Sequence, residues 1–128
     1  MTQTQVHRLG DLQLQILKVL WLRGEASVAA VHEALPNGSD LAYTTVATML
    51  RKMEARGLVT HRADGRTFIY HAAVAEDQVG QGMAEHVLDR IFEGRLADMV
   101  SHLLTAREVS RDELARLEQL IAERKRQS

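Results

Sequence analysis

Hydroxyl and basic side chains share one arc of a predicted helix near the middle of the chain. At about 100° per residue, one side of this helix is apolar and consists of Val46, Met49, Leu50 and Met53. The opposite arc carries Thr44, Thr45, Thr48, Arg51 and Lys52. Hydroxyl, guanidinium and ammonium groups donate hydrogen bonds to phosphates and base edges. This arc therefore has the chemistry of a nucleic-acid contact, although a solvated helix face is the ordinary alternative for each residue alone.

A β-hairpin is predicted directly after this helix. Gly57 can end the helix in the left-handed conformation, and the residues on either side of 63–66 are rich in β-branched and aromatic side chains. The turn is expected to centre on Asp64-Gly65, a pair suited to positive φ angles. Arg62 and Arg66 then lie at or near an exposed tip, where they can hold the flanking backbone or the minor groove of a nucleic acid.

Pairing across that turn divides the hairpin side chains between two faces. One face holds Val59, His61, Phe68 and Tyr70, and the other holds Thr60, Arg62, Thr67 and Ile69. We expect the aromatic face to pack inward, although Leu58 and Ile69 compete with it for packing against the core.

Two more helices are predicted before this segment. Residues 11–22 carry an apolar stripe after a capping Gly10-Asp11, and Ser27 is an N-cap candidate for residues 28–35. The order is then helix, helix, turn, helix, hairpin, which is typical of a winged helix-turn-helix. We expect a mainly α fold with a small β-hairpin, in which residues 1–74 form this domain.

Residues 75–128 are predicted to form three further amphipathic helices. The last has a capping box, Ser110 with Glu113, so a helix should begin at Arg111. Helices this short cannot bury their apolar stripes alone, so we expect a helical dimerisation region that packs against a second copy of the chain. The residues expected at that interface are Val87, Ile91, Met99, Leu103, Leu114, Leu117, Leu120 and Ile121.

The net charge of −1 over 128 residues hides an asymmetry. Residues 1–74 hold eight Lys and Arg against six Asp and Glu, whereas residues 75–128 hold eight against eleven. Within residues 44–66 the count is five basic against two acidic, a local charge of +3. Phosphate contacts respond to such a local field more than to the net charge.

Composition argues against several other classes of protein. The chain has no cysteine, so neither disulfides nor thiolate metal sites are expected, and its six histidines have no tight ligand spacing. No nucleophile elbow or phosphate loop is present, so we expect neither an enzyme nor a cofactor. No stretch approaches the roughly 20 apolar residues of a membrane span, and the start lacks a signal peptide. A cytoplasmic protein is the simplest interpretation.

Three segments closely resemble the penicillinase-repressor family of bacterial transcription factors, the BlaI/MecI group. They are LGDLQLQILKVLW (9–21), SVAAVHEAL (27–35) and LAYTTVATMLRKMEARGLVTHRADGRTFIYHA (41–72). The resemblance implies a repressor that binds a palindromic operator in double-stranded DNA as a homodimer. It makes the helix over about 43–56 the recognition helix, which would lie in the major groove. Residues 58–71 would be the wing, on the flanking backbone. Tyr43 would either contact a phosphate or cover the helix start.

The resemblance also bears on how such a repressor is released. Some members are cleaved at an Asn-Phe bond, which points to a membrane metallopeptidase sensor as a partner, but the corresponding stretch here is Val100-Ser101-His102-Leu103-Leu104. Two other functions are also compatible with the sequence. The polar arc can meet an acidic protein in a winged-helix interaction module, or the chain can be a repressor that senses a small ligand.

Overall fold

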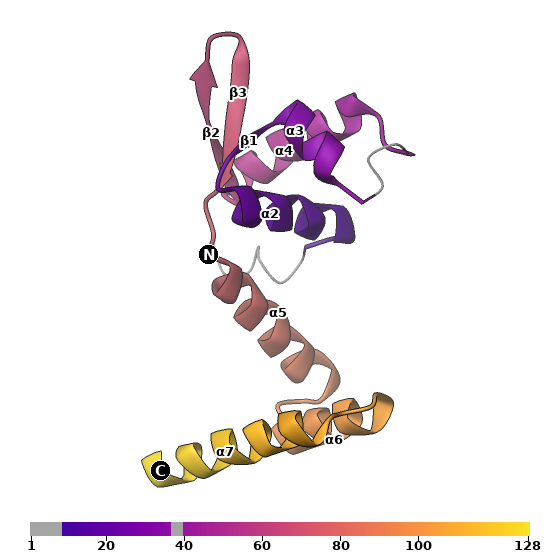
Figure 1. The fold of residues 1–128 in the computed structure, drawn as a ribbon, viewed down its shortest axis with the longest axis vertical. Coiled ribbons are helices and arrows are strands. Elements are labelled where there is room, and N and C mark those ends of the chain that lie inside the picture. Colours follow the sequence, from indigo (N-terminus) through magenta and orange to yellow (C-terminus); the bar gives the residue numbers. More distant parts are fainter. Residues whose placement is uncertain (1–8, 37–39) are drawn as a thin grey trace. The chain divides into compact units, whose positions relative to one another are not determined.

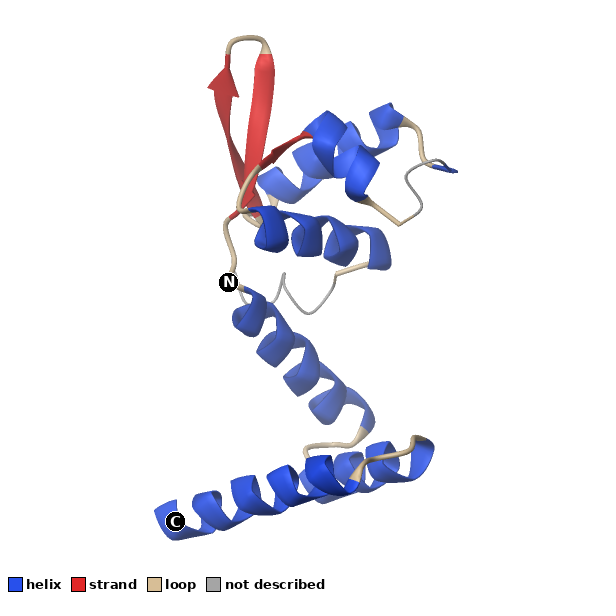
Figure 2. Cartoon of the chain, viewed as in Figure 1, coloured by secondary structure: helices blue, strands red, loops and turns tan. Residues whose placement is uncertain are grey.

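The computed structural model describes residues 9–36 and 40–128, and the chain divides into two compact units, Met1–His86 and Val87–Ser128 (Figure 1). In the first unit, helices gather at the base of a projecting hairpin (Figure 2). The elements of this unit are α2 (Asp11–Arg23), β1 (Ala26–Ser27), α3 (Val28–Ala34), α4 (Tyr43–Ala55), β2 (Val59–Asp64), β3 (Thr67–Ala72) and the first part of α5 (Glu76–Ile91). The predicted fold class, mainly α with a small β-hairpin, is confirmed.

The core of the first unit joins the apolar faces that the sequence pattern predicted. Ile16 and Leu17 of α2 are fully buried, as are Val31 of α3 and Leu50 of α4. Burial of this kind stabilises by roughly 25 cal/mol per Å² of apolar surface, so these faces determine how the helices pack. Val79 of α5 is also buried, which is why the first unit extends beyond the sheet to His86.

Helix α4 has the predicted bounds to within one residue. Its inner face is buried, and it ends at Arg56 followed by Gly57 with φ +78°. The Leu58 amide donates to the Met53 carbonyl at 2.9 Å and the Gly57 amide donates to the Glu54 carbonyl at 3.0 Å, which satisfies carbonyls at the helix end. The chain therefore enters β2 directly after the helix.

The sheet has three antiparallel strands in the order β1-β3-β2. The two-residue strand β1 was not predicted from the sequence; it pairs Ala26 with Tyr70 and thereby ties the end of α2 to the hairpin. In the hairpin, Asp64 pairs with Thr67, so the turn residues are Gly65 and Arg66, one position later than predicted. Gly65 has φ +63°, as the first position of a type II′ turn requires.

The second unit contains the end of α5 with α6 (Leu96–Ala106) and α7 (Arg111–Gln127). The predicted cap is present, because the Ser110 hydroxyl accepts a hydrogen bond from the Glu113 amide at 3.1 Å. This unit is described in full, and none of its residues is buried. Among the described helices of the whole chain, none is both long and apolar enough to cross a bilayer.

Candidate nucleic-acid interface and oligomerisation surface

The outer face of α4 brings four of the predicted contact residues together. Thr44, Thr45, Thr48 and Lys52 line one shallow hollow, and Met49 completes it. The threonines lie within the first two turns of the helix and the ammonium group of Lys52 one turn further on. Met49 was predicted to be core; it is half-buried and belongs to both the core and this hollow. This surface offers hydroxyls, methyls and one cation to a partner.

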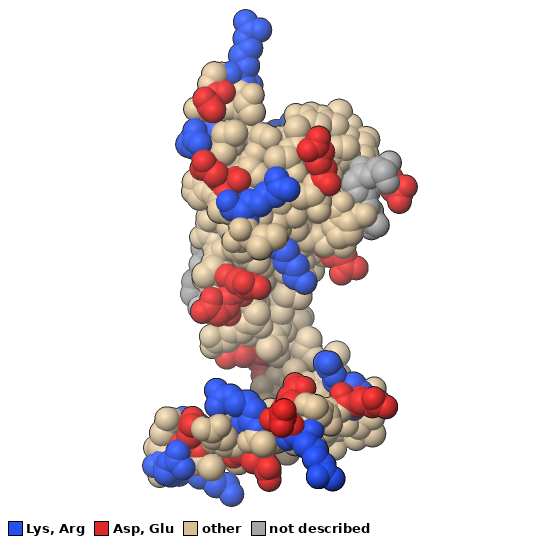
Figure 3. Space-filling model, viewed as in Figure 1, with Lys and Arg blue, Asp and Glu red and all other residues tan. Residues whose placement is uncertain are grey.

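A second hollow lies between the start of α3, the start of α4 and β3. Tyr43, Arg51 and Arg66 line it, so the remaining basic side chain of α4 faces the wing (β2, β3 and their turn). The Arg51 guanidinium donates to the Thr48 hydroxyl at 3.2 Å, which links the two hollows. At the top of Figure 3 a basic side chain projects beyond the tip of the wing, and Arg66 is one of the two turn residues there.

Phe68 also lines the second hollow and was not predicted to be a contact residue. The predicted division of the hairpin faces is confirmed, but only its base packs inward: Val59 and Tyr70 are buried, whereas Phe68 is 48% exposed. The hairpin extends beyond the core, so its outer half has no apolar surface to pack on. The Phe68 ring stacks instead on His61, with the ring centroids 4.1 Å apart.

Arg62 is the predicted contact residue that the structure places apart from the others. Its guanidinium donates to both Glu25 oxygens, Nη2 to Oε1 at 2.7 Å and Nε to Oε2 at 3.4 Å. The hydrogen bond and charge of Arg62 hold the pKa of the Glu25 carboxyl below its usual range, and the carboxylate raises the pKa of Arg62 in turn. Both side chains are about half-exposed.

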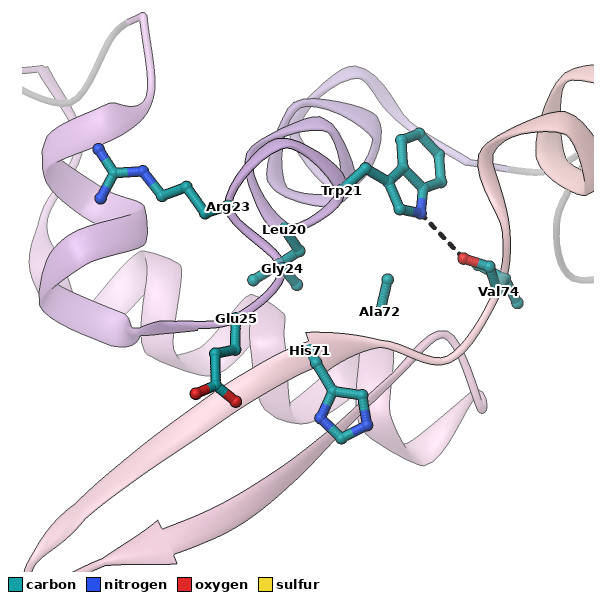
Figure 4. Close-up of a pocket in the computed structure, with 8 residues that line it drawn as sticks. All are labelled: Leu20, Trp21, Arg23, Gly24, Glu25, His71, Ala72 and Val74. Carbon is teal, nitrogen blue, oxygen red and sulfur yellow. Dashed lines mark hydrogen bonds between the residues drawn. The ribbon is translucent and has the colours of Figure 1, made fainter.

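Glu25 itself lies at the base of the sheet, in a hollow between the end of α2 and the end of β3 (Figure 4). His71 lines the same hollow, and the Trp21 indole donates to the Val74 carbonyl at 2.9 Å. That bond fixes the segment leaving β3.

Two histidines of the first unit make ordinary hydrogen bonds. His32 Nε2 lies 2.6 Å from the Leu41 carbonyl oxygen, and His71 Nε2 lies 2.7 Å from the Thr60 hydroxyl. In the part of the chain that the structure describes, no group of three or more His, Cys, Asp and Glu side chains could hold a metal ion.

The apolar residues predicted at a dimer interface are largely exposed on the second unit. Ile91 is 68% exposed, Ile121 is 55% and Leu103 is 50%, and Val87, Leu114 and Leu120 are exposed as well. Met99 and Leu117 are half-buried. Leu103 and Leu117 line a groove between α6 and α7, together with Val100, Leu104, Arg107, Val109 and Glu113.

Comparison with known proteins identifies the family. The penicillinase repressor family model matches residues 9–123. The chain belongs to the penicillinase repressor family. The match runs through both units, so the resemblance to this family is confirmed. The family consists of transcriptional repressors rather than enzymes, which also confirms that this member is not an enzyme.

Individual relatives agree with the family model. The chain is 26% identical to the penicillinase repressor of Bacillus licheniformis over 121 residues, 94% of each chain. It is 40% identical to the transcriptional regulator BlaI of Mycobacterium tuberculosis over 77 residues, 59% of this chain and 56% of that protein. The solution structure of the DNA-binding domain of the repressor BlaI superimposes with a TM-score of 0.50 at 26% identity, covering 57% of this chain and 89% of that one.

Proposed function

We propose that this family member represses transcription by binding a palindromic operator as a homodimer, with α4 in the major groove and the wing on the flanking backbone. The observation that carries the proposal is the continuous polar surface of α4, which runs from the threonines through Arg51 toward the basic wing tip. A helix with such a face fits the width of the major groove, and a basic hairpin beside it reaches the next stretch of backbone.

The chemistry of each group suggests its role. Thr44, Thr45 and Thr48 can bond base edges or phosphates, and a threonine methyl can touch a thymine methyl. Arg51 and Lys52 supply cations for guanine or phosphate, and Arg66 carries a cation to the flanking backbone. The Tyr43 hydroxyl, half-exposed beside Arg51, can donate to a phosphate.

The second unit supplies the argument for a homodimer. Its apolar side chains lie on both sides of the α6–α7 groove, and the same groove on a second copy offers the matching surface. A two-fold dimer interface is self-complementary, so each Leu117 would pack against equivalent apolar groups of the partner. Two recognition helices would then enter successive major grooves about 34 Å apart, at half-sites related by the same two-fold axis.

Selection of bound sequences from random duplexes, followed by titration at several salt concentrations, tests the proposal. We expect a two-fold symmetric consensus and an affinity that falls linearly with salt on logarithmic axes. Equal affinity for the selected palindrome and for random duplex would contradict a repressor function and favour a protein partner for the same surface. Sedimentation of the free protein should show a dimer.

Location and release are separate parts of the proposal. Binding to chromosomal DNA requires the cytoplasm, and we propose that location. A membrane metallopeptidase sensor stays a prediction from the family resemblance. Incubation of the protein with membranes that carry such a sensor, with fragments read by mass spectrometry, would reveal a cleavage site or show that the chain stays intact.

A further inference from the structure

Two consecutive wing residues are each held by a carboxylate, and they point to opposite faces of the hairpin. His61 faces α4, where its Nδ1 lies 2.7 and 2.9 Å from the two Glu54 oxygens. Arg62 faces the other way and donates to both oxygens of Glu25. One carboxylate comes from the recognition helix and the other from the segment before β1, so the wing is braced from both sides.

Glu25 is a firm anchor for such a brace because its backbone is fixed on both sides. Gly24, with φ +84°, ends α2 through a 2.8 Å hydrogen bond from its amide to the Leu20 carbonyl. Ala26, the next residue after Glu25, pairs with Tyr70 and is buried. The carboxylate therefore starts from the folded base of the unit and reaches across to the hairpin.

The opposite charges of Glu25 and Arg62 cancel locally, so Arg62 differs from Arg66, the other arginine of the wing. Two nitrogens of the Arg62 guanidinium, Nε and Nη2, already donate to the Glu25 oxygens, so a phosphate approaching Arg62 would also meet a carboxylate. Arg66 lies in the turn, and no ion pair holds it among the described residues. A bidentate pair fixes direction as well as distance, because the guanidinium fork matches the carboxylate.

We infer that Arg62 is a positioning residue that ties the wing to Glu25, and that Arg66 makes the backbone contact which the sequence assigned to both arginines. The inference rests on the proposed DNA-binding function and specifies how its wing is oriented. Together with Glu54 and His61, the pair sets the angle between the hairpin and α4. DNA affinity then depends on the presence of the pair and not on which of its two positions carries the cation.

A charge-balanced set of variants of the whole 128-residue chain tests this inference. The exchanged variant combines Glu25→Arg with Arg62→Glu and keeps both the net charge and the ion pair. The neutral variant combines Glu25→Gln with Arg62→Gln and keeps the net charge but removes the ion pair. Arg66→Gln serves as the reference for a lost phosphate contact. Affinity for the selected operator is measured for all of them at several salt concentrations.

The exchanged variant should bind within about twofold of the parent, and the neutral variant about two- to fivefold more weakly, in keeping with the small worth of exposed ion pairs. Both should keep the salt dependence of the parent. Arg66→Gln should instead reduce the magnitude of the slope of log affinity against log salt concentration by about 0.9. An exchanged variant that binds more weakly than the neutral one, with a slope lowered like that of Arg66→Gln, would show that Arg62 contacts phosphate and would overturn the inference.

A measurement without DNA separates this inference from the proposed function. Amide hydrogen exchange in β2 and β3 should be faster in the neutral variant than in the parent and should return to the parental rate in the exchanged variant. Unchanged exchange in all three proteins would also overturn the positioning role. If the parent binds no duplex with salt-dependent affinity, the repressor function fails, and the exchange rates still decide whether the pair orients the wing.

Discussion

The two units of the chain use apolar residues in opposite ways. Among the described residues, every buried apolar side chain lies in the first unit, and Val79 is the last of them. The second unit, Val87–Ser128, buries none, and it exposes Leu96 to 62% and Ile91 to 68%. The first unit closes its own core, whereas the second leaves leucines and isoleucines exposed. This contrast is expected when a self-sufficient module is joined to a module that is stabilised by association, as we propose for the second unit.

The largest effect should follow from opening the core of the first unit. Leu50→Ala removes a fully buried side chain between α4 and its neighbours, and we expect a loss of about 2–5 kcal/mol in the free energy of unfolding. Leu22→Ala, at a position 88% exposed on α2, is the matched control and should change stability little. Denaturant unfolding of the first unit measures both, and equal effects at the two positions would contradict the assignment of the core.

A charge in the groove of the second unit should act through association instead. Leu117→Asp places a carboxylate among Leu103, Leu104 and Val109, where a buried charge would lack a partner. We expect monomers in sedimentation and, because the two half-sites lose their linkage, operator affinity lowered on the order of 100-fold. Leu22→Asp is the control, since it adds the same charge at an exposed leucine of the first unit. A Leu117→Asp protein that still sediments as a dimer would refute the assigned interface.

The contact surface should lose affinity without losing stability. Arg51→Ala removes the cation that faces the wing, and we expect operator binding weaker by about 1–3 kcal/mol, as for loss of one base or phosphate contact. Because Arg51 is exposed and alanine favours helix, the unfolding transition should stay in place. Lys18→Ala, on the exposed side of α2, is a matched control for loss of one positive charge. Fluorescence anisotropy with operator and random duplexes would separate base contact from phosphate contact.

The sequence predicted features that depend on near neighbours in the chain, and it missed those that depend on pairing between distant segments. Periodicity located α4 to within one residue and the Ser110 cap of α7, because these features depend on neighbours three or four positions away. The strand β1 escaped prediction because two residues carry no periodic signal and become a strand only by pairing with β3. The shift of the hairpin turn to Gly65 and Arg66 is likewise set by strand register.

The sequence could predict which residues belong to the candidate site, but not which of them lie together in the fold. The arc of threonines and basic residues on α4 follows from helical geometry, and the structure brings most of it together. The Glu25–Arg62 pair joins residues 37 positions apart, and no local pattern reports such a contact. Phe68 was assigned to the packed face, because the alternation along β3 does not tell how far the hairpin extends beyond the core.

The smallest effect should come from a strained position in the second unit. Glu93 is the only described non-glycine residue with positive φ, at +51°, and it precedes Gly94 at +80° between α5 and α6. A side chain disfavours this region of backbone space, so Glu93→Gly should raise the stability of the dimer by about 0.5–1 kcal/mol. The substitution also removes the exposed ion pair between Glu93 and Arg95, at 3.2 Å, but this loss offsets little of the gain in stability.

Glu108→Gly, at a position without positive φ, is the control and should be neutral or destabilising. Thermal unfolding at matched protein concentrations compares the two, and a lower midpoint for Glu93→Gly than for Glu108→Gly would show that the ion pair outweighs the backbone strain.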